Sequence, residues 1–135
     1  MLFRSPKAIG VPILGDIPAG YPELRDEHRN GTLAVDPAML GGVAHHRLFA
    51  LQVKGDSMEE RGIFEGDWVV ADAEATPREK DVVVALIDGE NTLKTLAQKK
   101  GIFFLKAESP NHRDWIPVNE LVIQGVAKAI LRRIS

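Results

Sequence analysis

The sequence contains no cysteine among its 135 residues, which excludes disulfides, thiol chemistry and thiolate metal sites. It also lacks any apolar run that approaches the roughly 20 residues needed to cross a bilayer. Its start, MLFRSPKAIG, has no apolar stretch long enough for a signal peptide. The formal net charge of −2 gives no general reason to expect a nucleic-acid partner. We therefore expect a soluble, cytoplasmic protein that neither associates with membranes nor binds DNA directly.

The first third of the chain differs from the remainder in composition, because it is rich in proline and glycine. Prolines at this density exclude helix interiors and favour extended segments and turns. We predict an extended arm over residues 1–45, in which the short run Val11–Leu14 packs as a β-like piece, and a β-rich domain over residues 46–135. The same composition is typical of a linker, so whether the arm is docked or free stays open. The prolines and glycines that mark the arm are Pro6, Pro12, Pro18, Pro22, Gly10, Gly15, Gly20 and Gly31.

The later residues alternate between short apolar runs and turn signals, which is typical of strands. The run DVVVALI is continuous and β-branched, as expected of a strand buried on both faces. Asp88-Gly89 predicts a hairpin turn after it. Residues 120–134 allow a helix, but Gly125 and the β-branched content favour a long strand. The fold class is therefore mostly β, with bent sheets in one compact domain. The remaining predicted strands are LFALQV, DWVVAD, TLKTLA, GIFFLKAE and WIPV.

Ser57, in the stretch VKGDSMEERGIFEGDWVV, is a candidate nucleophile that needs a base to take its proton. No G-x-S-x-G elbow surrounds it, and Glu60 occupies the position where S-x-x-K would have lysine. Four histidines are candidate bases, but none has a recognisable setting, and we expect each to be a surface residue. They are His28, His45, His46 and His112.

Lys94 is a better candidate base, on the strand that returns from the predicted hairpin. If alternation places Thr92, Lys94 and Leu96 on an inward face, the lysine loses solvent. A desolvated lysine has a lowered pKa and is a usable base near neutral pH. The alternative is a lysine on the solvent face of an edge strand, and periodicity alone does not decide between the two.

Motifs for cofactors are missing. The sequence has no H-E-x-x-H, no P-loop and no G-x-G-x-x-G. The acidic stretch DSMEERGIFEGD lacks the ligand spacing of an EF-hand, so we expect a solvated acidic loop there. We expect neither a metal nor a cofactor.

Three segments in order resemble the LexA/UmuD family of self-cleaving serine peptidases. VKGDSMEERGIFEGDWVVAD is similar to the family's nucleophile segment, and VVVALIDGENTLKTL to its base segment. VPILGDIPAGYP is similar to its cleavage segment. AESPNHRDWIPV and VIQGVAKAILR resemble the closing segments, so the resemblance covers nearly the whole chain.

The resemblance implies that Ser57 is the nucleophile, Lys94 the general base and Ala19-Gly20 the scissile pair. Backbone N–H groups near Asp56 and Ser57 would bind the oxyanion. It further implies that a RecA–single-stranded DNA filament promotes docking of the arm during the SOS response to DNA damage.

The resemblance also implies a homodimer, formed through C-terminal strands such as Val122–Ile130. A strand edge that would otherwise be exposed gives such a contact a physical motive.

The chain has no helix-turn-helix pattern, so two interpretations of its place in the family stay open. The opening MLFRSP favours a UmuD-like subunit, which would serve an error-prone DNA polymerase. The Ala-Gly of DIPAG favours the catalytic domain of a LexA-type repressor. Two other functions also stay open. One is a non-enzymatic module that binds a polymerase or a repressor. The other is a signal-peptidase-like enzyme acting in trans, which would normally need a membrane anchor.

Overall fold

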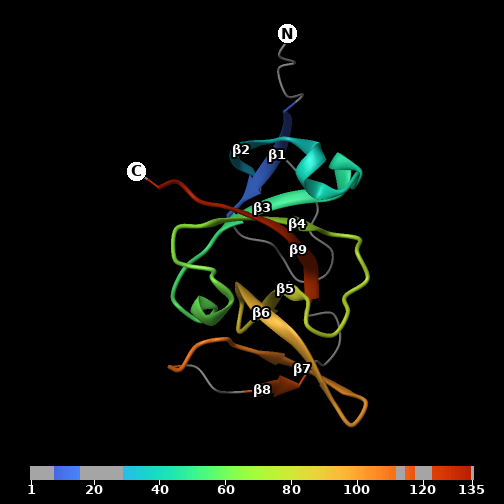
Figure 1. Ribbon diagram of the computed structural model, residues 1–135, viewed down its shortest axis with the longest axis vertical. Coiled ribbons are helices and arrows are strands. Elements are labelled where there is room, and N and C mark those ends of the chain that lie inside the picture. The colour runs from blue at the N-terminus through green and yellow to red at the C-terminus, as the bar shows by residue number, and fades with distance from the viewer. Residues whose placement is uncertain (1–7, 16–28, 112–114, 118–122, 135) are drawn as a thin grey trace, which may run out of the picture.

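Nine strands form one sheet in the computed structural model, which describes residues 8–15, 29–111, 115–117 and 123–134. Their order across the sheet is β2-β1-β3-β4-β9-β5-β6-β7-β8, and they follow one another along the molecule in Figure 1. The mostly β prediction is confirmed. The strands are β1 (Ile9–Leu14), β2 (Arg29–Val35), β3 (Leu48–Gln52), β4 (Trp68–Asp72), β5 (Val82–Ile87), β6 (Glu90–Lys99), β7 (Ile102–Lys106), β8 (Trp115–Pro117) and β9 (Ile123–Leu131). The described residues also form short 3-10 helices, namely η2 (Pro37–Leu40), η3 (His45–Arg47) and η4 (Glu59–Arg61).

The predicted hairpin and the predicted C-terminal strand are both present. β5 and β6 pair antiparallel, and the turn between them has positive φ at Asp88 (50°) and Gly89 (78°). Positive φ at both central residues is the conformation that hairpin twist requires, and Asp-Gly adopts it readily. The ambiguous region 120–134 contains strand β9 and no helix in its described part, residues 123–134.

Strand β2 was not predicted. It pairs antiparallel with β1, with Ile9 opposite Val35 and Val11 opposite Leu33. Its sequence, RNGTLAV, has little periodicity, and Gly31 has a φ of 103°. The strand therefore depends on its partner β1 more than on its own residues, and local sequence patterns do not reveal such a dependence.

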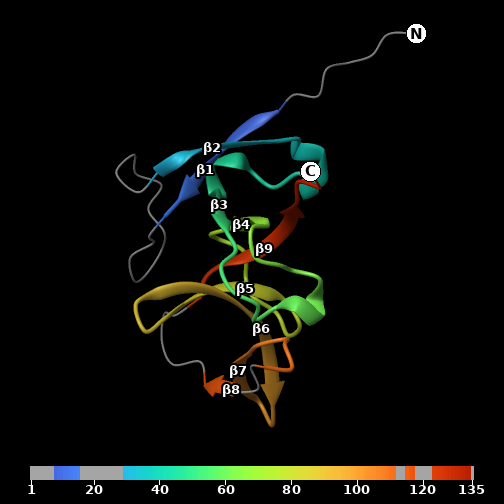
Figure 2. The same cartoon turned by 90° about the vertical axis from the view of Figure 1, so that its left-hand side faces the viewer.

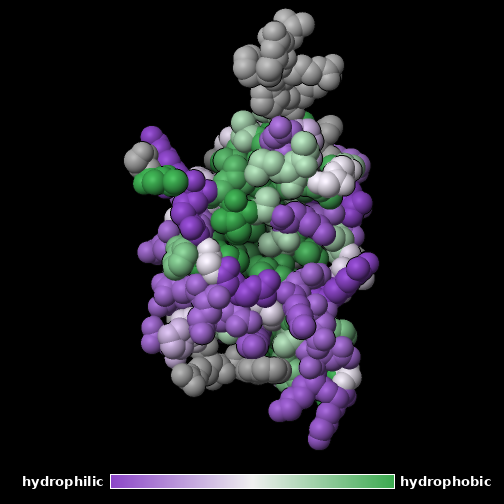
Figure 3. Space-filling model, in the orientation of Figure 1, coloured by the Kyte–Doolittle hydropathy of each residue, from purple (hydrophilic) through white to green (hydrophobic). Residues whose placement is uncertain are grey.

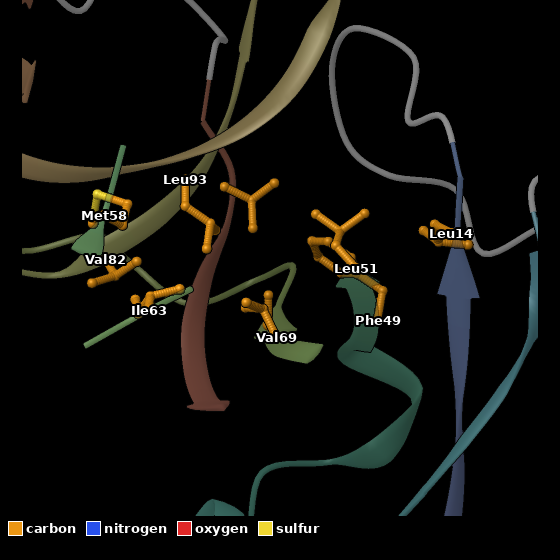
Figure 4. Packing of buried hydrophobic residues seen from close by; sticks show 10 residues of the cluster. Leu14, Phe49, Leu51, Met58, Ile63, Val69, Val82 and Leu93 are labelled. Carbon is orange, nitrogen blue, oxygen red and sulfur yellow. The ribbon is translucent and has the colours of Figure 1, made fainter. Parts of the chain in front are cut away.

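The core consists of three apolar clusters distributed over the two faces of the sheet. Val82 and Val84 of β5 belong to the first cluster, and Val83 and Ala85 belong to the third. All four are at most 9% exposed, so the prediction of a strand buried on both faces is confirmed. Figure 4 shows the first cluster, with Leu14 of β1 lying toward side chains of β3. Its members are Leu14, Phe49, Leu51, Met58, Ile63, Val69, Ala71, Val82, Val84 and Leu93.

β9 is an inner strand that joins the two halves of the sheet. Residues 126–131 pair with β4, and residues 123–126 pair with β5. The prediction that the C-terminal strand is an exposed edge is therefore wrong for its first half. Among the described strands, none pairs with residues 127–131 on the side opposite β4, so only this part keeps an open edge.

Within the part of the chain that the structure covers, no helix is long and apolar enough to cross a membrane.

Candidate active site

The loop that carries Ser57 leaves the sheet after β3 and returns to it at β4. Two backbone hydrogen bonds close its neck: Val53 N donates to Asp67 O at 2.8 Å, and Gly66 N donates to Val53 O at 2.9 Å. Gly55, with a φ of 79°, turns the chain into the loop, a conformation that glycine adopts at little cost. The loop is therefore held at a fixed place between two core strands.

The backbone of Ser57 is fixed on a second side by the segment after β7. Ser57 O accepts from Glu108 N at 2.7 Å, and Glu60 N donates to Glu108 O at 2.7 Å. The next residue, Met58, is 1% exposed and packs in the first apolar cluster. Because its backbone is anchored and its neighbour is buried, the backbone of Ser57 has little freedom to shift relative to the sheet.

Lys94 on β6 reaches this hydroxyl. Its Nζ lies 3.3 Å from Ser57 Oγ and 3.4 Å from Thr92 Oγ1, and the side chain is half-buried. It forms no ion pair with any described carboxylate. Burial lowers the pKa of Lys94 below 10.5, because the charged ammonium loses water without gaining a counter-charge. Of the two interpretations that periodicity left open, the structure agrees with the one in which Lys94 loses solvent.

A pocket of about 550 Å³ opens at Ser57. Strands β3, β4 and the β5–β6 hairpin contribute to its lining, and so do Leu14 and Gly15 at the end of β1. Ala19 is the fourth residue after Gly15, and an extended chain spans at most about 13 Å over four residue steps. The strand that precedes the predicted cleavage site therefore leads to the pocket that contains the serine.

The structure brings together some of the predicted site residues, and others lie beyond it. Ser57 and Lys94 meet, whereas Ala19-Gly20 lies outside the described residues. The N–H of Ser57 donates to no acceptor in the described chain, and Asp56 Oδ2 accepts from Asn111 at 3.5 Å.

His46 is the one histidine whose side chain is described, and it does not hydrogen-bond Ser57. His28 and His112 lie outside the described residues, and His45 and His46 belong to η3. Among the described side chains, Lys94 is the only one that hydrogen-bonds Ser57 Oγ.

One acid of the nucleophile loop is not solvated, contrary to the prediction. Asp67 is 2% exposed and accepts from Arg132 Nε and Nη2, both at 2.6 Å, and from Phe64 N at 2.8 Å. Arg132 also donates to Gly62 O at 2.7 Å and lies 4.8 Å from the centre of the Phe64 ring. Because Asp67 and Arg132 are 65 residues apart, no local pattern could have indicated this pair.

The Asp67–Arg132 pair predicts a pH-dependent contribution to stability. The hydrogen bonds from Arg132 are the main cause that lowers the pKa of Asp67 below 3.8. A carboxyl with a lowered pKa stabilises the fold above its unfolded value, and this contribution is lost as the pH falls through the folded value. We therefore expect Arg132→Gln to reduce the free energy of unfolding at pH 7, measured in urea, and the difference from wild type to shrink at pH values below 3.8. Lys128→Gln, an exposed change on β9 four residues before Arg132, should have little effect. If Arg132→Gln reduced the free energy of unfolding equally at pH 7 and below pH 3.8, the account would be contradicted.

Arg61 is a second residue that the sequence did not single out. Its Nη1 donates to Thr95 Oγ1 at 3.2 Å and to Lys80 O at 3.1 Å. Thr95 directly follows Lys94, and Arg61 lies four residues after Ser57. Arg61 therefore links the nucleophile loop to the strand of the candidate base.

The fold and the site together define a β-rich domain in which a serine lines a pocket and a partly buried lysine lies beside the serine. Such a pair is of the type that activates a serine nucleophile. Residues 12–128 match the family described as Peptidase S24-like, and the chain belongs to this family.

Relatives with this domain carry the name LexA repressor. The one from Verrucomicrobium spinosum is 43% identical over 126 residues, which cover 93% of this chain and 62% of the relative. LexA repressor 1 of Nocardia farcinica is 37% identical over 130 residues, covering 96% of this chain and 58% of the relative. The relative from Acidothermus cellulolyticus is 36% identical over 130 residues, which cover 96% of this chain and 46% of the relative. The chain thus spans 46–62% of the length of these curated relatives.

Proposed function

We propose that this chain is a self-cleaving serine peptidase that cuts its own Ala19-Gly20 bond. The observation that carries the proposal is the contact of Lys94 Nζ with Ser57 Oγ, 3.3 Å apart, at a pocket reached by β1. Membership of the Peptidase S24-like family supports it. Because substrate and site belong to one chain, proximity replaces substrate binding, and docking of the arm sets the rate.

In the proposed reaction Lys94 acts first as a base and then as an acid. Neutral Lys94 takes the Ser57 proton while Ser57 Oγ attacks the carbonyl carbon of Ala19. The N–H groups of Asp56 and Ser57 stabilise the negative oxygen that forms. The Ala19–Gly20 bond then breaks, and protonated Lys94 gives its proton to the amine of Gly20. A water molecule attacks the ester between Ser57 and Ala19, which restores the hydroxyl.

The reaction depends on neutral lysine, which gives it a definite pH dependence. Burial lowers the pKa of Lys94 below 10.5, so the neutral fraction rises through a range below that value. We expect purified protein to yield a fragment of residues 20–135, with a rate that rises as the pH is raised toward alkaline values. Intact-mass spectrometry over time measures both the product and the rate. If wild type yields no such fragment, even with a RecA–single-stranded DNA filament added, the proposal fails.

The biological setting follows from the family resemblance. We propose that the RecA–single-stranded DNA filament stimulates cleavage during the SOS response, as in LexA- and UmuD-like proteins. The names of the relatives, which are LexA repressors, support the LexA-like interpretation. A UmuD-like role with an error-prone polymerase predicts that the cleaved form binds such a polymerase, which a pull-down would measure.

We also propose that the chain forms a homodimer through the later part of β9, within the predicted Val122–Ile130 region. The open edge at residues 127–131 offers unpaired backbone groups to a second copy. Partly exposed apolar side chains accompany this edge, among them Ala129, Leu131 and Val43. Figure 3 shows apolar surface gathered over the half of the molecule that holds β1, β3 and β9. A polar substitution such as Leu131→Glu should therefore favour the monomer.

A further inference from the structure

β1 precedes the proposed cleavage site in the chain, yet it is an inner strand of the sheet. It lies between β2 and β3, and Figures 1 and 2 show it there in two perpendicular views. It pairs antiparallel with β2 at Ile9, Gly10, Val11, Pro12 and Leu14. It also pairs parallel with β3, where Ile13 lies opposite Ala50. A cut between residues 15 and 29 would sever the connection between β1 and β2 without removing any of these pairs.

The side chains of β1 contribute to two apolar clusters. Val11 is 0% exposed and packs with Val35, Leu48 and Val70 in the second cluster. Leu14 is 3% exposed and belongs to the first cluster. For the amino-terminal product to leave, both side chains must return to water, and the apolar partners behind them must be exposed. Release is therefore opposed by burial as well as by strand pairing.

We propose that cleavage does not by itself release the amino-terminal product, and that β1 remains bound as a noncovalent strand between β2 and β3. The surface left by its departure is a groove for an extended apolar peptide, of the kind that binds by adding a strand to a sheet. Cutting and release are then two separate steps, and whatever precedes β1 stays attached until the strand leaves the sheet. The inference rests on the proposed function for how the cut arises in the native chain.

The weaker side of the bound strand is its edge with β3. Only one residue pair joins the two strands, and Pro12, next to it, has no N–H to donate. Retention therefore depends mainly on the pairing with β2 and on the buried Val11 and Leu14. Substitutions at Val11 thus test the proposal more directly than substitutions along the β3 edge.

The test uses a cut that does not depend on the peptidase. The full chain carries Ser57→Ala and a recognition sequence for a site-specific protease, inserted between Gly20 and Tyr21. After complete cutting, size-exclusion chromatography and native mass spectrometry are run at micromolar concentration. We expect the two fragments to elute together with a mass equal to their sum, and to separate only in denaturant. An amino-terminal fragment that elutes alone under native conditions would overturn the proposal.

Variants distinguish specific retention from nonspecific adhesion. Val11→Ala removes two buried methyl groups and should raise the dissociation constant of the cut chain by about tenfold or more. Ala8→Asp, at an exposed position just before β1, should leave it unchanged. If the two fragments bound each other equally tightly with Val11→Ala and without it, the proposal would be contradicted. If the wild-type chain never cuts itself, the proposed function fails, whereas the protease-cut chain still decides whether β1 is retained.

Discussion

Ser57→Ala is expected to abolish self-cleavage while the fold persists. The substitution removes the attacking oxygen and leaves in place the backbone hydrogen bond from Glu108 N to the carbonyl oxygen of residue 57. The loss of a nucleophile of this kind lowers a rate by a factor of about 10⁴ or more. The rate is measured by intact-mass spectrometry at alkaline pH, and the fold by circular dichroism. The matched control is Ser109→Ala, a buried serine that accepts from Asn111 N at 3.3 Å.

Lys94→Ala should cause a loss of similar size for a different reason. The hydroxyl remains, but no described group other than Lys94 hydrogen-bonds it to take its proton. Lys99→Ala, an exposed change on the same strand, should cleave at the wild-type rate. If Lys94→Ala kept more than about a tenth of the wild-type rate, another base would have to act, and the proposed role of Lys94 would be wrong.

Gly125→Ala is expected to lower the stability of the fold, although it adds only one methyl group. A Cβ at this position would lie 2.8 Å from Phe49 Cε1 and 3.0 Å from the backbone oxygen of Asp72. Neither neighbour can yield easily, because Phe49 is 0% exposed and the oxygen belongs to a central strand. Overpacking of this kind costs about 1–3 kcal/mol of the free energy of unfolding. Urea denaturation measures the change.

The same substitution should also slow cleavage. β9 joins β4, which follows the Ser57 loop, to β5, which pairs with the strand of Lys94. A shift of β9 therefore changes the distance between the side chains of Ser57 and Lys94. Gly10→Ala is the control, because its Cβ would meet only the end of the exposed Thr32 side chain, which can rotate away. Equal destabilisation by both changes would show that close packing at Gly125 is not the cause.

Local patterns predicted those parts of the fold that depend on neighbours in sequence. The apolar run of β5 and the Asp88-Gly89 turn are short-range signals, and the structure follows them. β2 and the inner position of β9 depend on which strands meet across the sheet, and no local pattern records that choice. The Asp67–Arg132 pair is missing from the prediction for the same reason.

The candidate site shows the same limit. Periodicity placed Lys94 on a strand but left its exposure open, and only family resemblance paired it with Ser57. The contact requires the β5–β6 hairpin and the Ser57 loop to approach each other across 37 residues of sequence. Burial of Lys94 likewise results from tertiary packing, so its lowered pKa could not be derived from the strand alone.

The most direct test of the account compares two titrations of the same protein. One is the cleavage rate as a function of pH, and the other is the titration of Lys94 followed by nuclear magnetic resonance in the Ser57→Ala chain. We predict that the rate rises with a midpoint that coincides with the pKa of Lys94 and lies below 10.5. A Lys94 pKa at or above 10.5, together with cleavage that is already at its maximum at neutral pH, would contradict the account.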